Sequence, residues 1–184
     1  DSKTEFGKIP ERWEVKLVGD LLAKINRKSK IKKGDYDSFG MFPVIDQGQS
    51  FIGGYTSNKE AIYKECLPII VFGDHTRVLK FIDFPFACGA DGTQLLSSNT
   101  ERMPNVLFFY NLQHIDLSNY AYARHLKFLE AEKILLPDEK TAAAFSDLVY
   151  PIRGFMKSLL WNNTKLYQAR DLLLPKLVTG EIKV

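Results

Sequence analysis

Histidine, cysteine and carboxylate side chains carry much of enzyme chemistry, and their spacing here fits none of the common catalytic arrangements. His75, His114 and His125 are too far apart for a His-x-x-x-His metal pair on one helix. The run 137–140, PDEK, superficially resembles a nuclease signature. Its acids are contiguous at a predicted helix start, where they suit the helix dipole instead of a metal. A serine-hydrolase elbow, a Walker loop, a dinucleotide fingerprint and methyltransferase motifs are all absent from the sequence.

Polar side chains at predicted loop tips suit a different chemistry, the recognition of base edges. In the DNA major groove arginine pairs with guanine, and glutamine or asparagine pairs with adenine, each through two hydrogen bonds. A single cluster of this kind is usually a hydrated loop, but several together indicate a DNA-binding protein. The candidate residues form four clusters: Gln47 and Gln49; Asn58 and Lys59; His75, Thr76 and Arg77; and Tyr122, Arg124, His125 and Lys127.

A local concentration of positive charge supports the same interpretation. The segment 24–33, KINRKSKIKK, contains six basic residues and no acidic residue, although the whole chain has a net charge of only +3. Such a field favours a phosphate backbone through counterion release. A solvated loop or an exposed helix face remains the alternative. The basic residues are Lys24, Arg27, Lys28, Lys30, Lys32 and Lys33.

The elements that must position these residues have the patterns of a mixed α/β domain. A β-branched run and an alternating run are separated by a Gly-Asp turn, so residues 73–77 are predicted to be the loop of a hairpin or a tight connection. Proline followed by an apolar stretch predicts a short helix. The predicted strands are 67–72, 78–82, 43–45 and 93–96, and the predicted short helix is 105–112.

A long helix is predicted from the N-cap Asp138 to the residue before Pro175, with a kink near Pro151. About 37 residues at 1.5 Å each give about 55 Å, longer than a globule of about 137 residues, so part of the helix should project. The alternative is a helix that folds back on its own domain. Its apolar residues follow an alternating three-and-four spacing, which favours a coiled-coil partner. This seam comprises Phe145, Leu148, Ile152, Phe155, Leu159, Asn162, Leu166, Ala169 and Leu173.

Length and composition set the remaining expectations. The 184 residues, 45% of them hydrophobic, suffice for one domain with an extension. No apolar run approaches the roughly 18 residues of a membrane-spanning helix, and no cleavable signal peptide is visible, so we expect a cytoplasmic protein without a membrane partner. Cys66 and Cys88 each lie in an apolar stretch and are expected to be buried free thiols, with no zinc site.

Several stretches resemble the specificity (S) subunits of type I restriction-modification systems. The N-terminal stretch GKIPERWE, residues 7–14, is similar to that family's opening to a target recognition domain. The resemblance covers essentially the whole chain and is most specific at its two ends. The matching stretches are 7–17, 20–21, 42–45, 53–55, 71–76, 89–93, 124–129, 135–137 and 172–182.

The resemblance implies an α+β fold in three parts: a target recognition domain over 1–137, a coiled-coil spacer and dimerisation helix over 138–175, and a tail over 176–184. It implies that the domain recognises one half of a bipartite site in double-stranded DNA. The chain would dock modification (methyltransferase) subunits and restriction subunits and have no active site of its own. It would hold no cofactor, because S-adenosylmethionine, ATP and Mg belong to the partner subunits.

The sequence departs from the family in having one recognition domain and one long helix instead of two of each. It therefore corresponds to a natural half-subunit or to a truncated form, and the absence of an initiator Met before Asp1 fits processing or cutting. We expect it to form a homodimer, or to pair with the second half of a full S subunit, through the helix seam. The alternatives are a coiled-coil protein-interaction scaffold without sequence-specific DNA recognition and, more remotely, an enzyme acting on nucleic acid unaided.

Overall fold

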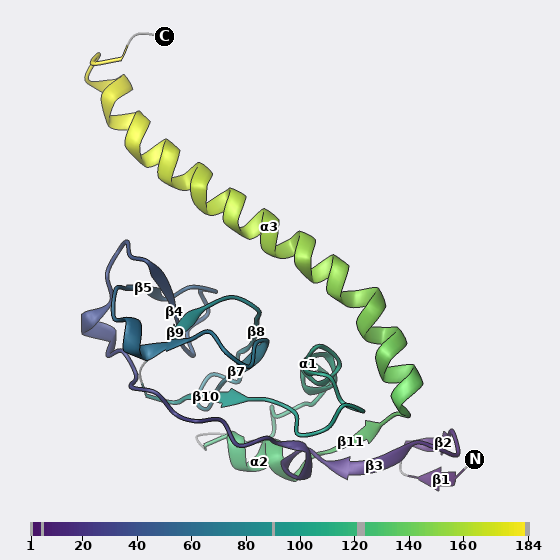
Figure 1. The fold of residues 1–184 in the computed structure, drawn as a ribbon. Coiled ribbons are helices and arrows are strands. Elements are labelled where there is room, and N and C mark those ends of the chain that lie inside the picture. The colour runs from purple at the N-terminus through teal and green to yellow at the C-terminus, as the bar shows by residue number, and fades with distance from the viewer. Residues whose placement is uncertain (1, 5, 90, 121–123, 183–184) are drawn as a thin grey trace. The chain divides into compact units, whose positions relative to one another are not determined.

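The computed structural model describes residues 2–4, 6–89, 91–120 and 124–182. Contacts divide the chain into two compact units, Asp1–Phe145 and Ser146–Val184. All described strands and short helices lie in the first unit, and one long helix begins there and continues through the second. The fold is α+β, as the sequence predicted (Figure 1).

A three-stranded antiparallel sheet has β7 (Ile69–Gly73) at its centre, between β10 (Thr93–Leu96) and β8 (Leu79–Ile82). All five residues of β7 are buried, as its run of β-branched and aromatic residues requires. The predicted hairpin between β7 and β8 is confirmed, with Phe72 paired to Leu79 at the turn.

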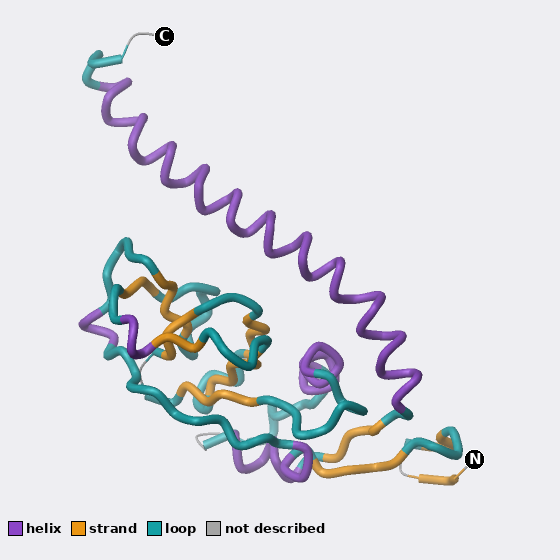
Figure 2. Tube along the Cα trace, viewed as in Figure 1, coloured by secondary structure: helices purple, strands orange, loops and turns teal. Residues whose placement is uncertain are grey.

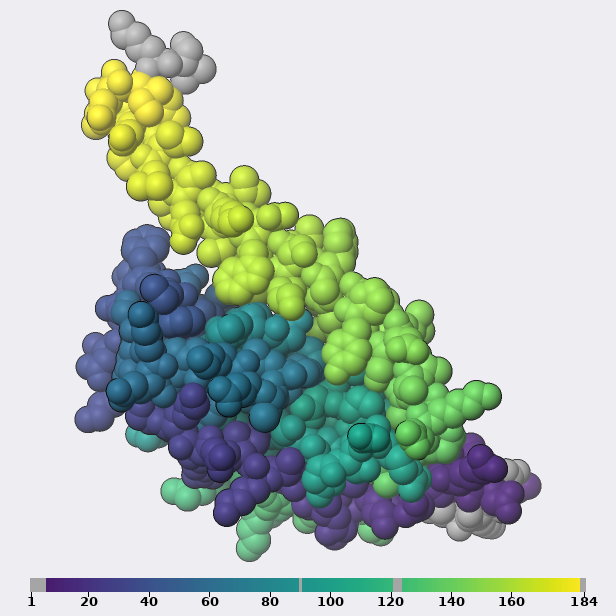
Figure 3. All heavy atoms as spheres, in the orientation of Figure 1, coloured from purple at the N-terminus to yellow at the C-terminus, as the bar shows by residue number. Residues whose placement is uncertain are grey.

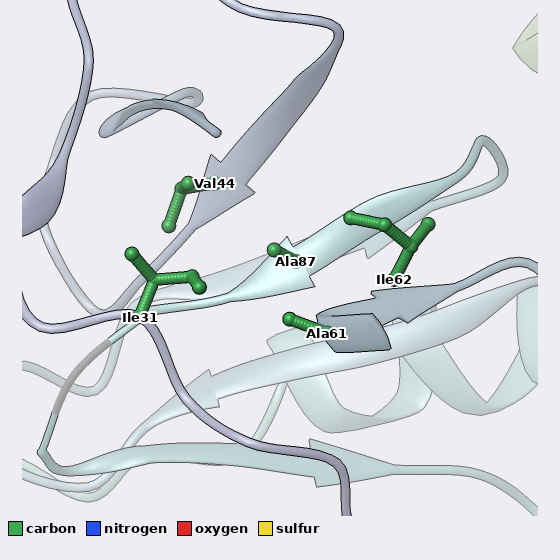
Figure 4. Packing of buried hydrophobic residues seen from close by; sticks show 5 residues of the cluster. All are labelled: Ile31, Val44, Ala61, Ile62 and Ala87. Atoms are coloured by element: carbon green, nitrogen blue, oxygen red, sulfur yellow. The ribbon is translucent and has the colours of Figure 1, made fainter. Parts of the chain in front are cut away.

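A second sheet has the order β5-β4-β9-β6. Its central strands β4 (Phe42–Ile45) and β9 (Phe86–Cys88) are parallel, while β5 (Gly54–Thr56) and β6 (Ile62–Tyr63) are antiparallel to their neighbours. Ile31 packs into the core of this sheet, so the basic segment 24–33 is attached to it by an apolar side chain. Figure 4 shows the cluster: Ile31, Val44, Ala61, Ile62 and Ala87.

Two shorter strand pairs complete the first unit. β1 (Ser2–Thr4) pairs with β2 (Gly7–Ile9), and β3 (Glu14–Leu17) pairs with β11 (Lys133–Leu136). The second pair joins the beginning of the unit to its end. Short 3₁₀ turns lie between the strands: η1 (Gly19–Leu21), η2 (Lys33–Asp35) and η3 (Lys59–Ala61).

Two short helices accompany the sheets. α1 (Asn105–Gln113) begins after Pro104 as predicted, and the Phe109 ring packs against Phe81 of β8 with centroids 5.5 Å apart. The Asn105 side chain donates to Pro68 O (2.7 Å) and accepts from Ser98 N (2.7 Å), which secures the start of α1. α2 (Leu126–Ala131) was not predicted, because its six residues are too few for a periodic pattern.

The long helix α3 spans Glu139–Val178 and contains both Pro151, near which a kink was predicted, and Pro175. Figure 2 draws it as one unbroken helix. Asp138 caps its start: Oδ1 accepts from Thr141 N at 3.0 Å and Oδ2 from Thr141 Oγ1 at 2.7 Å. The expected end before Pro175 was wrong by one turn. Thr179 N donates to Pro175 O (2.9 Å), and the termination comes at Gly180, whose φ of +73° suits a glycine after a helix.

The expectation of two buried thiols was half wrong. Cys88 is buried on β9, but Cys66 is exposed. Cys66 belongs to the turn between β6 and β7 and has a φ of 58°, so this apolar stretch is interrupted by a turn that the hydrophobic pattern did not reveal. Both cysteines are free thiols.

Candidate nucleic-acid interface

Three loops of the first unit meet around the side chain of Gln47. Its Nε2 donates to Asp91 O (2.8 Å) and its Oε1 accepts from His75 N (3.2 Å). Its backbone carbonyl accepts from Thr76 Oγ1 (2.7 Å). We call the three loops the loop cluster: 46–50 after β4, 73–77 between β7 and β8, and the described part of 89–92 between β9 and β10.

The loops pack so closely that a glycine is required at their junction. Gly92 has a φ of +76°, and a Cβ atom there would lie 2.6 Å from Gln47 Nε2 and 2.7 Å from the His75 ring. A side chain there would be strained by the positive φ and would displace the side chain of Gln47 or His75. Glycine at this position therefore allows the loops to pack closely.

The outward side of the loop cluster presents Gln49, His75, Thr76 and Arg77, all exposed. Arg77 adopts a left-handed φ of 61°, and its Nη1 donates to Leu117 O at 3.0 Å. This bond orients the guanidinium. Residues far apart in the sequence thus form one polar surface of amide, imidazole, hydroxyl and guanidinium groups, which can donate to and accept from base edges.

The base of the loop 46–50 is held by a buried charged network that the sequence did not reveal. Lys80 Nζ donates to Asp46 O and Ser50 O, both at 2.7 Å, and lies 3.8 Å from Asp46 Oδ1. The same carboxylate accepts from Gly48 N (2.9 Å) and Tyr36 Oη (3.2 Å). Burial lowers the pKa of the Lys80 ammonium, and the Asp46 carboxylate opposes this shift.

The basic segment 24–33 is an irregular stretch along the surface of the first unit (Figure 3). Two of its ammonium groups bind the chain itself: Lys28 Nζ donates to Ile62 O (2.6 Å) and Lys30 Nζ to Thr93 O (2.7 Å). These two residues therefore help to fix the segment as well as contributing charge. All six basic residues are exposed: Lys24, Arg27, Lys28, Lys30, Lys32 and Lys33.

A cavity of about 450 Å³ lies between this segment and the sheets, and Arg27, Tyr63 and Cys88 are among the residues that line it. Burial raises the pKa of the Cys88 thiol to about 11, and the nearby cations Lys30 and Arg27 only partly offset this. Cys88 is therefore a protonated thiol near neutral pH and a poor nucleophile.

The other predicted clusters lie on different elements. Asn58 caps η3, with its Oδ1 accepting from Glu60 N (3.1 Å), and Lys59 is the exposed first residue of that turn. Arg124 lies two residues before α2 and Lys127 is its second residue, and both are exposed. Tyr122 lies outside the described residues.

His125 joins the start of α2 to the loop cluster. The prediction that His125 belongs to an exposed polar cluster was wrong, because its side chain is buried. Its Nδ1 lies 2.8 Å from Asp74 O, and its Nε2 lies 2.8 Å from Tyr120 O. The Asp74 carboxylate in turn accepts from Leu126 N at 2.8 Å. These bonds connect the loop 73–77 to the start of α2 at Asp74, whereas Gln47 contacts the same loop at His75 and Thr76. Sequence spacing gave no sign of them.

Among the described residues, no group of three or more His, Cys, Asp and Glu side chains could hold a metal ion. No described helix is long and apolar enough to span a bilayer.

Comparisons with known proteins point to one family. No protein-family model matches the chain. It is 28% identical over 131 residues to the EcoR124I/EcoR124II specificity subunit of Escherichia coli, covering 66% of this chain and 32% of that protein. It is 25% identical over 199 aligned positions to a protein assigned as the MjaX type I specificity subunit of Methanocaldococcus jannaschii, covering 99% and 46%. The chain is similar to type I restriction-modification specificity subunits.

Solved structures share the fold of these specificity subunits. The type I restriction-modification S subunit from M. genitalium superposes with a TM-score of 0.65 at 14% identity, covering 91% of this chain and 46% of that one. The HsdS subunit from Thermoanaerobacter tengcongensis gives 0.54 at 15% identity, covering 97% and 48%. The chain thus spans less than half the length of each of these specificity subunits.

The long helix of this specificity-subunit fold has an exposed apolar seam. Leu148, Phe155 and Leu166 are 69%, 65% and 66% exposed. Ile152, Leu159 and Leu173 are also exposed. Asn162 and Ala169 lie exposed at the polar and small positions of the seam, while Phe145, in the first unit, is half-buried with its ring 5.9 Å from that of Tyr110.

Proposed function

We propose that this chain is a DNA sequence-specificity subunit, or half-subunit, of a type I restriction-modification complex, and that its first unit binds one half of a bipartite target. The observation that supports this most directly is the loop cluster, where exposed Gln49, His75 and Arg77 are held on a rigid base in a chain related to specificity subunits.

In this proposal the two polar regions have different tasks. The basic segment 24–33 binds the phosphate backbone, which adds affinity for any sequence. The loop cluster contacts base edges, because its side chains offer both donors and acceptors and are held within fixed loops. Further contacts to the DNA come from exposed residues outside these two regions: Asn58, Lys59, Arg124 and Lys127. Recognition would therefore need both regions, but only the loop cluster would choose the sequence.

The second unit serves assembly. A seam of exposed Leu, Ile and Phe side chains is costly in water and favours burial against another helix. We propose a second copy of this chain, or the second half of a full specificity subunit, as that helix. An isologous pairing would bring together two recognition units, one from each chain.

Catalysis in this proposal belongs to the partner subunits. Modification subunits would methylate the DNA with S-adenosylmethionine, and restriction subunits would use ATP and Mg to cleave it. The chain itself would supply binding and orientation alone.

Selection of duplexes from a random library, with the chain bound to its modification subunit, tests the proposal. We expect an enriched motif and a steep decrease of affinity with salt. Retention of all sequences alike would contradict the proposal and favour a coiled-coil scaffold. Cleavage or methylation by the purified chain alone would contradict the assignment of catalysis to partners.

A further inference from the structure

Lys80 is a buried lysine on a strand whose neighbouring residues form the core. It lies on β8 opposite Val71, with its side chain only 3% exposed. Lysine is rarely buried unless its ammonium group is paired, because loss of hydration is costly. An apolar side chain would fill the same position without that cost. The burial of lysine at this position is therefore explained by the hydrogen bonds of its ammonium group, and not by packing.

Its partners are the two ends of one loop. Asp46 O and Ser50 O each accept from Lys80 Nζ at 2.7 Å, so a single ammonium group closes the loop 46–50 across its base. Lys28 and Lys30 provide a contrast, since each is exposed and each binds a single backbone carbonyl. Lys80 is the one of these three that bridges two carbonyls of the same loop.

The closed loop determines where its outward side chains lie. The Asp46 carboxylate accepts from Gly48 N (2.9 Å), which fixes the turn from inside, and leaves Gln49 exposed at its tip. Gln47 O accepts from Thr76 Oγ1 (2.7 Å), so a shift of the loop 46–50 would also shift the loop 73–77. Both loops thus depend on the same buried ammonium group.

We propose that Lys80 is a positioning residue for base recognition: it sets the placement of Gln49 and of the loop 73–77, and thereby the sequence preference, without contacting DNA. This inference rests on the proposed function. It predicts that loss of the Lys80 ammonium group alters the ratio of specific to nonspecific affinity more than the affinity for random DNA.

The test compares Lys80→Met with Lys28→Met, which removes the same charge from an exposed lysine that also binds one carbonyl. Each variant of the full chain, bound to its modification subunit, is titrated with the selected duplex and with a random duplex at one salt concentration. We expect Lys80→Met to lower the affinity ratio about tenfold with random-duplex affinity within about twofold of the original. Lys28→Met should weaken both duplexes alike and keep the ratio.

Two further variants make the test independent of folding. Lys80→Arg retains the charge and should remain folded by circular dichroism, yet its longer planar group cannot occupy the same place between the two carbonyls, so the ratio should again fall. In a Gln49→Ala background, Lys80→Arg should lower the ratio by less than it does in the original chain, because part of its effect passes through Gln49.

The outcomes separate the two proposals. If the original chain prefers a sequence and folded Lys80→Met and Lys80→Arg keep that preference, the role of Lys80 is wrong while the proposed function holds. A folded variant that weakens both duplexes equally also overturns the positioning role. If the original chain shows no preference, both proposals fail.

Discussion

Phe81 on β8 is 1% exposed, whereas Phe155 on α3 is 65% exposed. Phe81 belongs to the first unit, where apolar side chains from the strands and short helices form a buried core. Phe155 belongs to the second unit, where Leu148, Leu159 and Leu166 are exposed as well. The same residue type thus completes a core in one unit and presents a surface in the other. This difference agrees with the proposal that the exposed seam of the second unit packs against another helix.

Truncation of each phenylalanine gives the sharpest test of this contrast. Phe81→Ala should lower the free energy of unfolding by about 3–5 kcal/mol, because it leaves a cavity beside Phe109. Phe155→Ala should change the stability of the first unit by less than about 0.5 kcal/mol. Urea unfolding followed by near-UV circular dichroism measures both. Equal losses in the two variants would show that the seam belongs to the monomer core.

A charge in the seam should abolish assembly. Leu166→Asp places two buried carboxylates in each symmetric dimer and should raise the dissociation constant at least about a hundredfold. Sedimentation equilibrium measures this, and Gln168→Asp, on the same helix but outside the seam, is the matched control. A chain that is already monomeric at high micromolar concentration would refute the predicted pairing.

Within the first unit, the two polar regions should respond differently to substitution. Lys32→Gln together with Lys33→Gln should weaken binding to every duplex and reduce the slope of log affinity against log salt by about 2, one for each phosphate that is no longer neutralised. Gln49→Ala or Arg77→Ala should instead change the preferred sequence. Fluorescence anisotropy at several salt concentrations separates the effects. The distinction between the regions is wrong if both sets of variants behave identically.

The smallest expected effect concerns the start of α3. Two donors on Thr141 hold the pKa of the Asp138 carboxyl below its ordinary value: its hydroxyl, which has the larger effect, and its backbone amide. The folded chain therefore binds this proton less readily than the unfolded chain. The stabilisation is complete above the ordinary carboxyl pKa and is lost as pH falls through the lowered one.

Asp138→Asn retains an acceptor for the Thr141 amide but has no carboxyl to titrate. Its melting temperature should be a few degrees lower than that of the original chain near neutral pH and should decrease less in acid. Calorimetry between about pH 2 and 7 measures this, with Asp147→Asn farther along α3 as the control. If the melting temperature of Asp138→Asn falls with pH as steeply as that of the original chain, the Asp138 carboxylate does not stabilise the start of α3.

Much of the fold could be predicted because the relevant signals are local. The hairpin of β7 and β8, the helix after Pro104 and the long helix after Asp138 follow from periodicity, turn residues and capping over a few positions. The end of α3 was predicted one turn too early, because Pro175 lies within the helix and does not end it. The exposure of Cys66 was missed because a turn interrupts the apolar run around it.

The candidate site was less accessible to sequence reasoning. Gln47 and Gln49 have the same type and adjacent loop positions, yet Gln47 holds three loops together and Gln49 is exposed. Lys28 and Lys30 look like any basic residues but bind backbone carbonyls. Lys80 looks like the outward residue of an alternating strand and is buried.

The sequence by itself determined the β7–β8 hairpin, α1, the start and the heptad spacing of α3, and the resemblance to specificity subunits, because these depend on residue type and short spacing. Only the tertiary structure decided which polar side chains are exposed and which are structural. Those roles depend on partners 28 to 44 positions away, as for Gln47 with His75 and Asp91, and on the burial of Lys80. Such contacts exist only once the two sheets have brought the loops together.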